Sequence, residues 1–314
     1  TFTGTSGTAT GHITMDTVGN ASVGAVSSSQ GSVDLETTAG TLTTGAVSGV
    51  AGVVLKSSGN LSTGALTSTN AGINAQSTTG SVALASAKAG TSLVANANAA
   101  LNLTTYTVSG GTATLTAGTT FTGTSGTASG NITLDAVGIT SVGTVTSSAG
   151  SIDLDVTAGT LTTGAVTGLT GVVLKSSGNL STGALTSANG GIHALSTMGS
   201  VALASAKAGS SLVANAKTSL ALTTYTVSAG SATLTAGSTF TGTSGTASGN
   251  ITLDAVGISS VGAVTSSAGT VDLEVTGAAL TTGAVSGGAA VVLKSSGNLG
   301  TGALTSLNGN VNTE

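Results

Sequence analysis

The sequence predicts an all-β fold, a right-handed parallel β-helix (a solenoid) of about 16 coils with about 20 residues in each. Three observations support this prediction: a 119-residue repeat, a shorter period of about 20 residues inside it, and alternating apolar residues where each short period begins. Repeats of this kind are typical of solenoids, in which each unit packs on its neighbours and the core continues from unit to unit.

The long repeat is visible by eye. The string TFTGTSGTAT at Thr1 returns almost unchanged at Thr120 and at Thr239, and Val53–Ser68 is identical to Val172–Ser187. The repeats therefore cover residues 1–119, residues 120–238 and, in part, residues 239–314. We expect one continuous β-helical shaft over residues 1–314, with six coils in each full repeat. Because both ends of the chain fall inside a repeat, we also expect a segment of a longer protein.

The short period divides each long repeat into six segments. In the second repeat, segments begin at Ile132, Ile152, Val172, Ile192, Leu212 and Ala232, and the next repeat begins its first segment at Ile251. The spacings are five of 20 residues and one of 19. Coils near 20 residues favour the right-handed form, whereas the left-handed hexapeptide form needs multiples of six.

Each segment opens with an apolar residue, any residue, and another apolar residue, as in Ile132 and Leu134. A period of two predicts a strand with these side chains facing inward. Glycines recur after each apolar group, and glycine is favoured at tight corners. The pattern predicts three short β stretches and three corners per coil, with neighbouring coils about 4.8 Å apart.

The composition limits the alternatives. The chain has 50 Gly, no Pro, no Cys and no Trp, only 5% charged residues, 39% hydrophobic residues and a mean hydropathy of +0.46. A disordered Gly/Ser-rich linker is disfavoured because linkers do not keep apolar residues at a fixed spacing. No apolar stretch approaches the length of a spanning helix, so we expect no transmembrane segment. A net charge of −4 without a basic cluster argues against nucleic acid as a partner.

The charged residues recur with the repeat. The fourth positions of the first three segments of each repeat are Asp16, Glu36 and Lys56, then Asp135, Asp155 and Lys175, then Asp254, Glu274 and Lys294. The second position of the second segment is also acidic in each repeat, as Asp34, Asp153 and Asp272. We interpret these side chains as charge ladders on the outer surface, about 5 Å apart on adjacent coils.

Two functional alternatives to such a ladder are less favoured. Paired carboxylates could serve a glycosidase or a lyase, but no Arg, and no convergent His or aromatic group, accompanies these acids. Asp153 and Asp155 could offer oxygen atoms to calcium, but the Gly-Gly-x-Gly-x-Asp repeat of calcium-binding β-helices is absent. We therefore expect no catalytic residue, no metal site, no cofactor and no enzymatic activity.

Histidine and asparagine complete the candidate residues. His12 corresponds to Asn131 and Asn250 in the other repeats, and His193 corresponds to Asn74, so we interpret both as exposed polar positions and not as metal ligands. Asn-x-Ser/Thr sequons make six residues candidates for glycosylation. They are Asn20, Asn60, Asn102, Asn131, Asn179 and Asn250.

The ranges Gly130–Gly159 and Gly171–Ser187 show the period best, and they resemble the repeat regions of filamentous-haemagglutinin-type exoproteins. These are large adhesins that Gram-negative bacteria export by two-partner secretion. The resemblance covers the whole chain as a periodic pattern. It implies a right-handed β-helical shaft, display outside the cell or on its surface, and a role in adhesion, cell contact or biofilm.

The leading functional hypothesis is therefore a structural shaft of a fibrous adhesin. Its implied partners are other shafts, packed side by side or end to end, and a host or neighbouring cell surface contacted by parts outside this chain. A repeated glycan- or protein-binding surface along the shaft is the alternative, and a polysaccharide-active enzyme is the third hypothesis.

Overall fold

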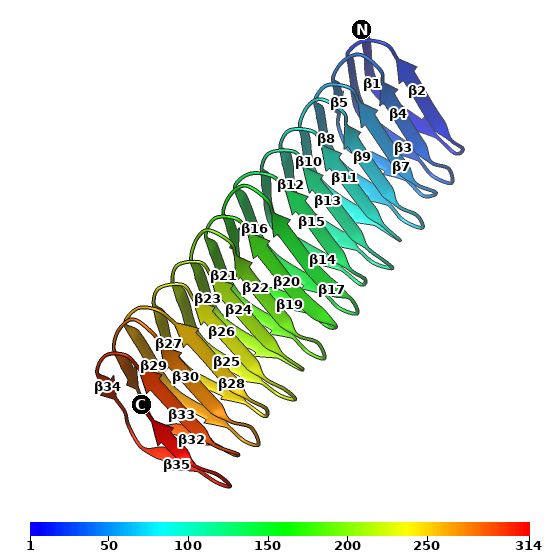
Figure 1. The fold of residues 1–314 in the computed structure, drawn as a ribbon. Coiled ribbons are helices and arrows are strands. Elements are labelled where there is room, and N and C mark those ends of the chain that lie inside the picture. The colour runs from blue at the N-terminus through cyan, green and yellow to red at the C-terminus, as the bar shows by residue number, and fades with distance from the viewer. The chain divides into compact units, whose positions relative to one another are not determined.

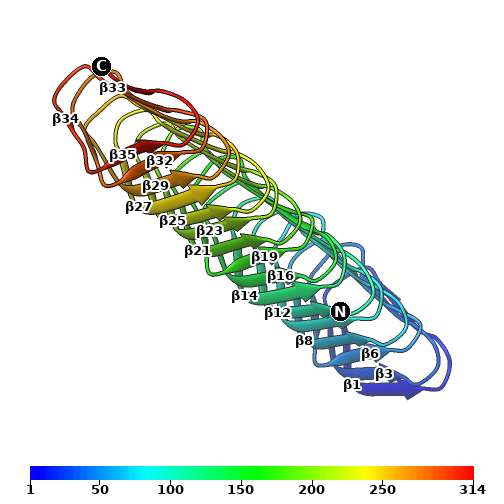
Figure 2. The same cartoon turned by 90° about the horizontal axis from the view of Figure 1, so that it is seen from below.

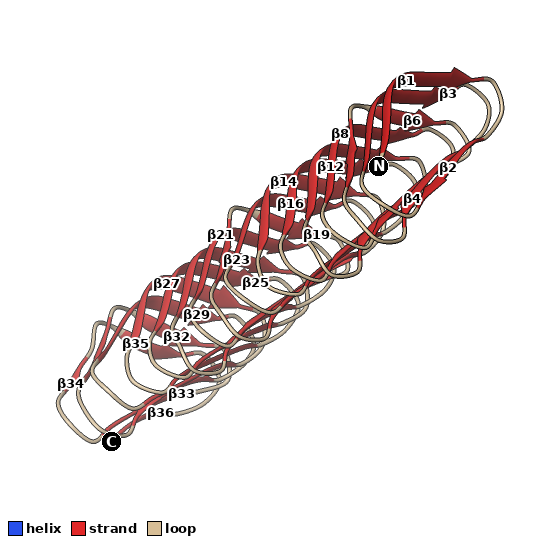
Figure 3. Ribbon diagram, turned by 90° about the horizontal axis from the view of Figure 1, so that it is seen from above, coloured by secondary structure: helices blue, strands red, loops and turns tan.

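The computed structural model describes residues 1–314, which form 36 β-strands and no helix. Figure 3 shows strands and loops only. The strands are parallel and stack in about 16 coils of about 20 residues, which makes the chain a β-solenoid and confirms the predicted fold class. The contacts divide the chain into two compact units, Thr1–Gly159 and Thr160–Glu314, and the boundary lies inside the second sequence repeat.

In both units a coil contains one short strand and one long strand (Figure 1). The short strands of the first unit pair with one another in chain order. They are β2 (Ile13–Thr17), β4 (Val33–Thr37), β7 (Val53–Ser57), β9 (Ile73–Ser77), β11 (Leu93–Ala97), β13 (Ala113–Ala117), β15 (Ile132–Ala136) and β17 (Ser151–Val156).

The long strands of the first unit form a second set of parallel pairs (Figure 2). They are β1 (Phe2–Ala9), β3 (Ala21–Ser28), β8 (Leu61–Ser68), β10 (Val82–Ala89), β12 (Leu101–Val108), β14 (Phe121–Ala128) and β16 (Thr140–Ser147). In the second coil the long strand is interrupted and becomes β5 (Leu42–Thr44) and β6 (Val47–Gly49).

The second unit has the same plan. Its short strands are β20 (Gly171–Ser176), β22 (Ile192–Ser196), β24 (Leu212–Ala216), β26 (Ala232–Ala236), β28 (Ile251–Ala255), β30 (Val271–Val275), β33 (Val291–Ser295) and β36 (Val311–Thr313). Its long strands are β21 (Leu180–Ser187), β23 (Val201–Ala208), β25 (Leu220–Val227), β27 (Phe240–Ala247) and β29 (Ser259–Ser266). Its interrupted long strands are β18 (Leu161–Thr163) with β19 (Val166–Gly168), β31 (Leu280–Thr282) with β32 (Val285–Gly287), and β34 (Leu299–Gly300) with β35 (Leu304–Ser306).

The core of each unit lies between its short and long strands. In a short strand such as β7, the first, third and fifth residues are buried, and Val53 and Leu55 are fully inaccessible to solvent. The residues between them face outward, as the period of two predicts. Equivalent residues stack from coil to coil, since Leu55 pairs with Leu35 on one side and with Ala75 on the other.

In the coils with an uninterrupted long strand, the structure corrects one detail of the sequence prediction, because two of the three predicted β stretches form a single bent strand. In β8 the first, third, sixth and eighth residues are buried, whereas Gly64 and Ala65 in the middle are not. The inward alternation changes phase at this pair, so the strand turns a corner there. The fourth residue of each long strand also leaves the ladder of paired Cα atoms.

Glycine is required where these bends stack closely. Gly24 and Gly143 occupy the bend in β3 and β16, and a Cβ atom on either would overlap the carbonyl oxygen of Thr5 or Thr124 in the coil before it. An alanine at these bends would push neighbouring coils apart. The glycine-rich corners therefore follow from the close coil-to-coil spacing.

Candidate functional site: the outward-facing columns

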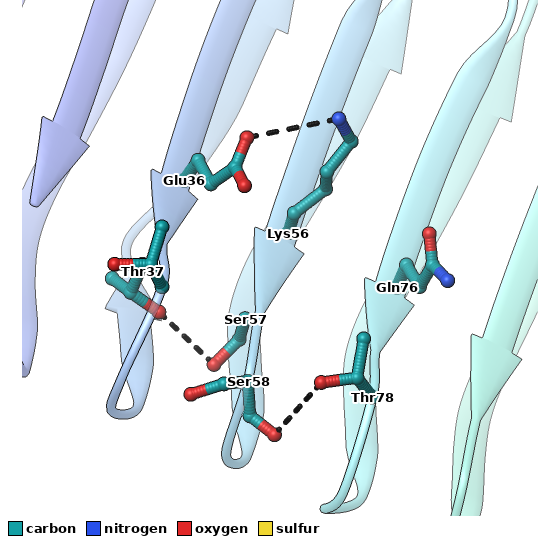
Figure 4. Close-up of a pocket in the computed structure, with 8 residues that line it drawn as sticks. Glu36, Thr37, Lys56, Ser57, Ser58, Gln76 and Thr78 are labelled. Atoms are coloured by element: carbon teal, nitrogen blue, oxygen red, sulfur yellow. Dashed lines mark hydrogen bonds and ion pairs between the residues drawn. The ribbon is translucent and has the colours of Figure 1, made fainter. Parts of the chain in front are cut away.

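The short strands present the second and fourth residues of each 20-residue segment on the outer surface, and equivalent residues form columns that run from coil to coil within each unit. In the first unit the fourth-position column places Asp16 beside Glu36, Glu36 beside Lys56, and Lys56 beside Gln76. This is the adjacency that the charge-ladder interpretation requires. Figure 4 shows Glu36, Lys56 and Gln76 side by side on three successive strands.

A shallow hollow of about 180 Å³ lies along this part of the column (Figure 4). The Lys56 ammonium lies 3.7 Å from the Glu36 carboxylate, and both side chains are more than one-third exposed. Water screens such a pair, so it contributes little to stability. The remaining lining groups are hydroxyls and one amide, from Thr37, Thr38, Ser57, Ser58, Gln76 and Thr78.

The hydroxyls beside this ion pair are used by the fold itself. Ser57 Oγ donates to the carbonyl oxygen of Gly40 at 2.8 Å, and Thr37 Oγ1 lies 3.2 Å from Ser57 Oγ. Ser58 Oγ accepts the Gly40 N–H at 2.7 Å. These hydrogen bonds stabilise the corner of the coil, so few polar atoms of the hollow remain to bind a ligand.

The third repeat has the same types of charged residue at these positions, but they interact differently. In the second unit Asp254 pairs with Glu274, and Glu274 pairs with Lys294 in register, but no ion pair joins Lys294 to Glu274. Burial, and then the negative charges of Glu274 and Asp272, raise the pKa of Asp254. A hollow of about 280 Å³ lies here, lined by both carboxylates and by Ala236, Ala255 and Val256 among others.

The second repeat contributes to both units. Asp135 and Asp155 are neighbours in the first unit, on β15 and β17. Lys175 belongs to the second unit, where it pairs in register with Leu195 on β22. The structure therefore joins the two fourth-position carboxylates of this repeat, Asp135 and Asp155, in one ladder of the first unit.

The second-position acids do not converge with groups that could make them catalytic. Asp34, Asp153 and Asp272 each have one carboxylate oxygen that is buried and has no hydrogen-bond partner. Their nearest register neighbours are apolar or hydroxyl residues, such as Val54 beside Asp34 and Thr252 beside Asp272. No three His, Asp or Glu side chains are arranged so that they could hold a metal ion.

Five of the six sequon asparagines serve as corner caps in the structure. The side-chain Oδ1 atom of each accepts a backbone N–H from the next coil at 2.9 Å. The pairs are Asn20 with Thr41, Asn60 with Ser81, Asn131 with Ser151, Asn179 with Ser200, and Asn250 with Thr270. The sixth, Asn102, is exposed at the second position of β12, between Ala83 and Thr122 on the adjacent strands. Glycosylation at these residues stays a prediction.

His12 makes the same cap as the asparagines that replace it. Its Nδ1 atom accepts the Ser32 N–H at 3.1 Å, and Ser32 Oγ lies 2.7 Å from the same atom. In the other repeats Asn131 and Asn250 accept at this corner, which explains the exchange between His and Asn in the sequence. His193 faces outward on β22 between Val173 and Val213, and burial, followed by the nearby Lys175 charge, lowers its pKa.

Sequence reasoning missed a column of hydroxyls at the seventh position of the long strands. In each unit this position is Ser or Thr in every coil except one, where it is Lys88 or Lys207. The signal in the sequence is a Ser or Thr just before the last buried residue of each long strand. We call these residues the hydroxyl column. In the first unit they are Thr8, Ser27, Ser48, Thr67, Lys88, Thr107, Thr127 and Thr146. In the second unit they are Thr167, Thr186, Lys207, Thr226, Thr246, Thr265, Ser286 and Thr305.

The architecture and its outer columns define a β-solenoid with a repetitive polar surface. A scan against protein-family models finds no match, and neither do searches of curated proteins and of solved structures. The chain contains no helix that could span a membrane.

Proposed function

We propose that this chain is a structural shaft of a secreted or surface-displayed fibrous adhesin that acts in adhesion, cell contact or biofilm formation. The observation that carries the proposal is that copied sequence folds into copied structure. The identical stretches that end in β8 and β21 give strands of the same length with the same pattern of burial. Adding a repeat therefore adds coils of the same kind, about 29 Å for six coils at the usual strand spacing.

The outer surface supports a structural role. Most of its charged side chains stand in ladders at the outer face of the short strands, and several of its hydroxyls and asparagine amides cap corners. A chain that is only 5% charged offers little opposition to close contact between neighbouring shafts. The proposed setting is the outside of a Gram-negative bacterium, with other copies of the shaft and a target cell surface as partners.

Deletion of one 119-residue repeat from the full-length protein tests the proposal. A shaft loses about 29 Å of reach in electron micrographs and keeps its affinity for the target in solution. A loss of affinity without a loss of reach would overturn it. A deletion of one 20-residue coil is the graded control, because it removes about one coil spacing and leaves the remaining coils paired.

A repeated binding surface is the second candidate function, and the hydroxyl column favours it. The column offers hydroxyls on consecutive coils with one lysine in each full repeat, which suits contact with a glycan or a protein along the shaft. In this case the deletion of one repeat lowers avidity for a multivalent ligand. Replacing Lys88 and Lys207 with Ala then weakens binding further without changing reach.

An enzymatic role is not part of the proposal. Asp153 and Asp155 are the acids that a polysaccharide-active enzyme would use in the first unit. Turnover of a polysaccharide that is abolished by Asp153→Asn or Asp155→Asn would replace the shaft hypothesis with an enzyme.

A further inference from the structure

The corner after β21 contains the dipeptide Asn189–Gly190, in which Asn189 is exposed and Gly190 is half-buried. The backbone N–H of Asn189 donates to the carbonyl oxygen of Leu169 at 2.9 Å, which holds this residue against the coil before it. Neither the Asn189 side chain nor the Gly190 N–H has a hydrogen-bond partner in the protein. The Asn189 side-chain amide and the Gly190 backbone nitrogen can react with each other, and no hydrogen bond within the protein holds either of them back.

We propose that Asn189 is a site of spontaneous modification, at which the folded protein converts asparagine to aspartate and isoaspartate. The backbone nitrogen of Gly190 attacks the side-chain carbonyl carbon of Asn189 and forms a five-membered succinimide. The Gly190 amide proton is lost, and the side-chain nitrogen leaves as ammonia. Water then opens the ring at one of its two carbonyls. No electrons are transferred, and water is the one co-reactant.

Glycine at position 190 makes this ring closure easy, because no side chain obstructs the attacking nitrogen. The structure also shows why this corner keeps its glycine. A Cβ atom at Gly190 would overlap the carbonyl oxygen of Thr170 in the preceding coil. The close packing of the corner therefore retains the residue that makes Asn189 reactive.

The first repeat provides a matched corner with a less reactive sequence. There the corresponding residues are Asn70 and Ala71, and the Asn70 N–H donates to Val50 O at 3.0 Å as Asn189 does to Leu169. The coil before this corner contains Gly52 with a φ of 135°, the left-handed conformation that favours glycine. The backbone thus differs between the two repeats, and the Ala71 methyl group hinders cyclisation at Asn70.

The third repeat provides a second comparison, Asn308–Gly309, which has the reactive sequence but is tethered. Asn308 Nδ2 donates to the carbonyl oxygen of Gly288 at 2.9 Å, and the Gly309 N–H donates to Ser306 Oγ at 3.2 Å. The side-chain amide and the attacking nitrogen must both be released before the ring can close. We expect the folded protein to react at Asn189 first.

The isoaspartate product changes the corner more than the aspartate product. Isoaspartate adds one carbon to the main chain, directly before Gly190. The carbonyl oxygen of Gly190 accepts the N–H groups of Gly209 and Ser210, each at 3.1 Å, so a shift of the main chain disturbs the contact with the next coil. Aspartate keeps the main chain and adds a negative charge at an exposed position.

Ageing of the purified chain at mildly alkaline pH tests the proposal. Peptide mapping by mass spectrometry, released ammonia and labelling by an isoaspartyl methyltransferase measure the products. We expect Asn189 to convert roughly tenfold or more faster than Asn308, since two hydrogen bonds must open at Asn308. Asn70 serves as the slow reference. If Asn308 or Asn70 converts as fast as Asn189 in the folded chain, the proposal is wrong.

Two further arms separate the effect of structure from that of sequence. In denaturant, Asn189 and Asn308 should react at similar rates, because both precede glycine and both are then free. Ser306→Ala removes one tether and should accelerate Asn308 in the folded chain roughly fivefold. A rate difference that persists in denaturant, or no acceleration in the Ser306 variant, would show that the fold does not control the reaction.

Discussion

The sixth and seventh residues of the long strands are neighbours in the sequence and face opposite ways. The sixth residues form an inner column, which in the first unit runs Gly7, Val26, Val47, Leu66, Ala87, Tyr106, Gly126, Val145. Its side chains range from glycine to tyrosine, whereas the hydroxyl column beside it hardly varies. The contrast shows that inner residues must fit one another in size, whereas outer residues need only present a polar surface.

Tyr106 shows how the inner column fits. It is buried between Ala87 in the coil before it and Gly126 in the coil after it. A Cβ atom at Gly126 would overlap the Tyr106 ring, so the large side chain requires its small neighbour. Tyr225 and Gly245 repeat the arrangement in the second unit. Burial raises the pKa of both tyrosines well above the usual value, so both stay neutral.

This complementarity limits which coils can be neighbours. A coil with tyrosine stacks well only beside coils with small residues at the same position, so coils cannot be exchanged freely. The copied unit is therefore six coils in a fixed order. Four predictions test the contrast between inner and outer columns, from the largest expected effect to the smallest.

Truncation of an inner leucine gives the largest effect. Leu66 is 1% exposed in the inner column, and Leu66→Ala should lower the free energy of unfolding by about 2–5 kcal/mol, because it leaves a cavity. Thr67→Ala in the hydroxyl column is the matched control and should change it by less than about 0.5 kcal/mol. Denaturant unfolding measures both. Equal effects of the two variants would contradict the contrast.

Addition of one methyl group to the inner column comes next. Gly126→Ala should cost about 1–3 kcal/mol because the new Cβ atom strikes the Tyr106 ring. Combining Gly126→Ala with Tyr106→Leu should restore much of the loss. If the changes in unfolding free energy of the two single variants simply add up in the double variant, Gly126 and Tyr106 do not couple.

The corner caps should have a smaller effect. Asn131→Ala removes the acceptor of the Ser151 N–H and should cost about 0.5–1.5 kcal/mol, since water replaces it only in part. Asn131→His should be nearly neutral, because His12 accepts the Ser32 N–H at the equivalent corner. Hydrogen exchange of the Ser151 amide and thermal unfolding measure both variants. A histidine variant as unstable as the alanine variant would disprove the equivalence.

Substitution of the outer charges should change the free energy of unfolding least, and the change should have opposite signs at Glu36 and at Asp254. Glu36→Gln breaks the exposed pair with Lys56 and should cost at most about 0.5 kcal/mol. Asp254→Asn should instead stabilise the neutral-pH protein by at most about 0.5 kcal/mol, because it removes a carboxylate that burial, and then the negative charges of Glu274 and Asp272, disfavour.

The pH dependence distinguishes these two charge variants. Because the folded-state pKa of Asp254 is raised, its protonated form favours folding at low pH, and this contribution is lost as pH rises through the folded pKa. The gain from Asp254→Asn should therefore vanish as pH falls below the ordinary range of a carboxyl group. A gain that is independent of pH would show that the loss of the ionised Asp254 carboxylate is not its cause.

Several features were predictable from the sequence because they are local. The alternation of Ile132 and Leu134 fixed which residues face inward, since a strand has a period of two. The equal spacing of segments placed Asp16, Glu36 and Lys56 on adjacent strands, as the register shows. The Asn–His exchange at position 12 correctly indicated an exposed polar position.

Other features depended on contacts between coils. The pattern gave three β stretches, but only the folded chain shows that two of them form one bent strand around Gly64 and Ala65. The hydroxyl column was not predicted because serine and threonine are abundant throughout the chain. Their alignment is visible only when the coils are stacked in register. The tethering that separates Asn308 from Asn189 is likewise invisible in the shared Asn–Gly sequence.

The sequence by itself determined the coil, its length and its inward face, because these depend on residues close together in the chain. The tertiary structure decided how residues on adjacent coils fit against one another, as Gly126 fits over the Tyr106 ring and as the Ser151 N–H meets the Asn131 side chain. The physical reason is that stacked coils share space and hydrogen bonds across a strand spacing of about 4.8 Å. At that distance, size and polarity must match between residues that the chain itself keeps apart.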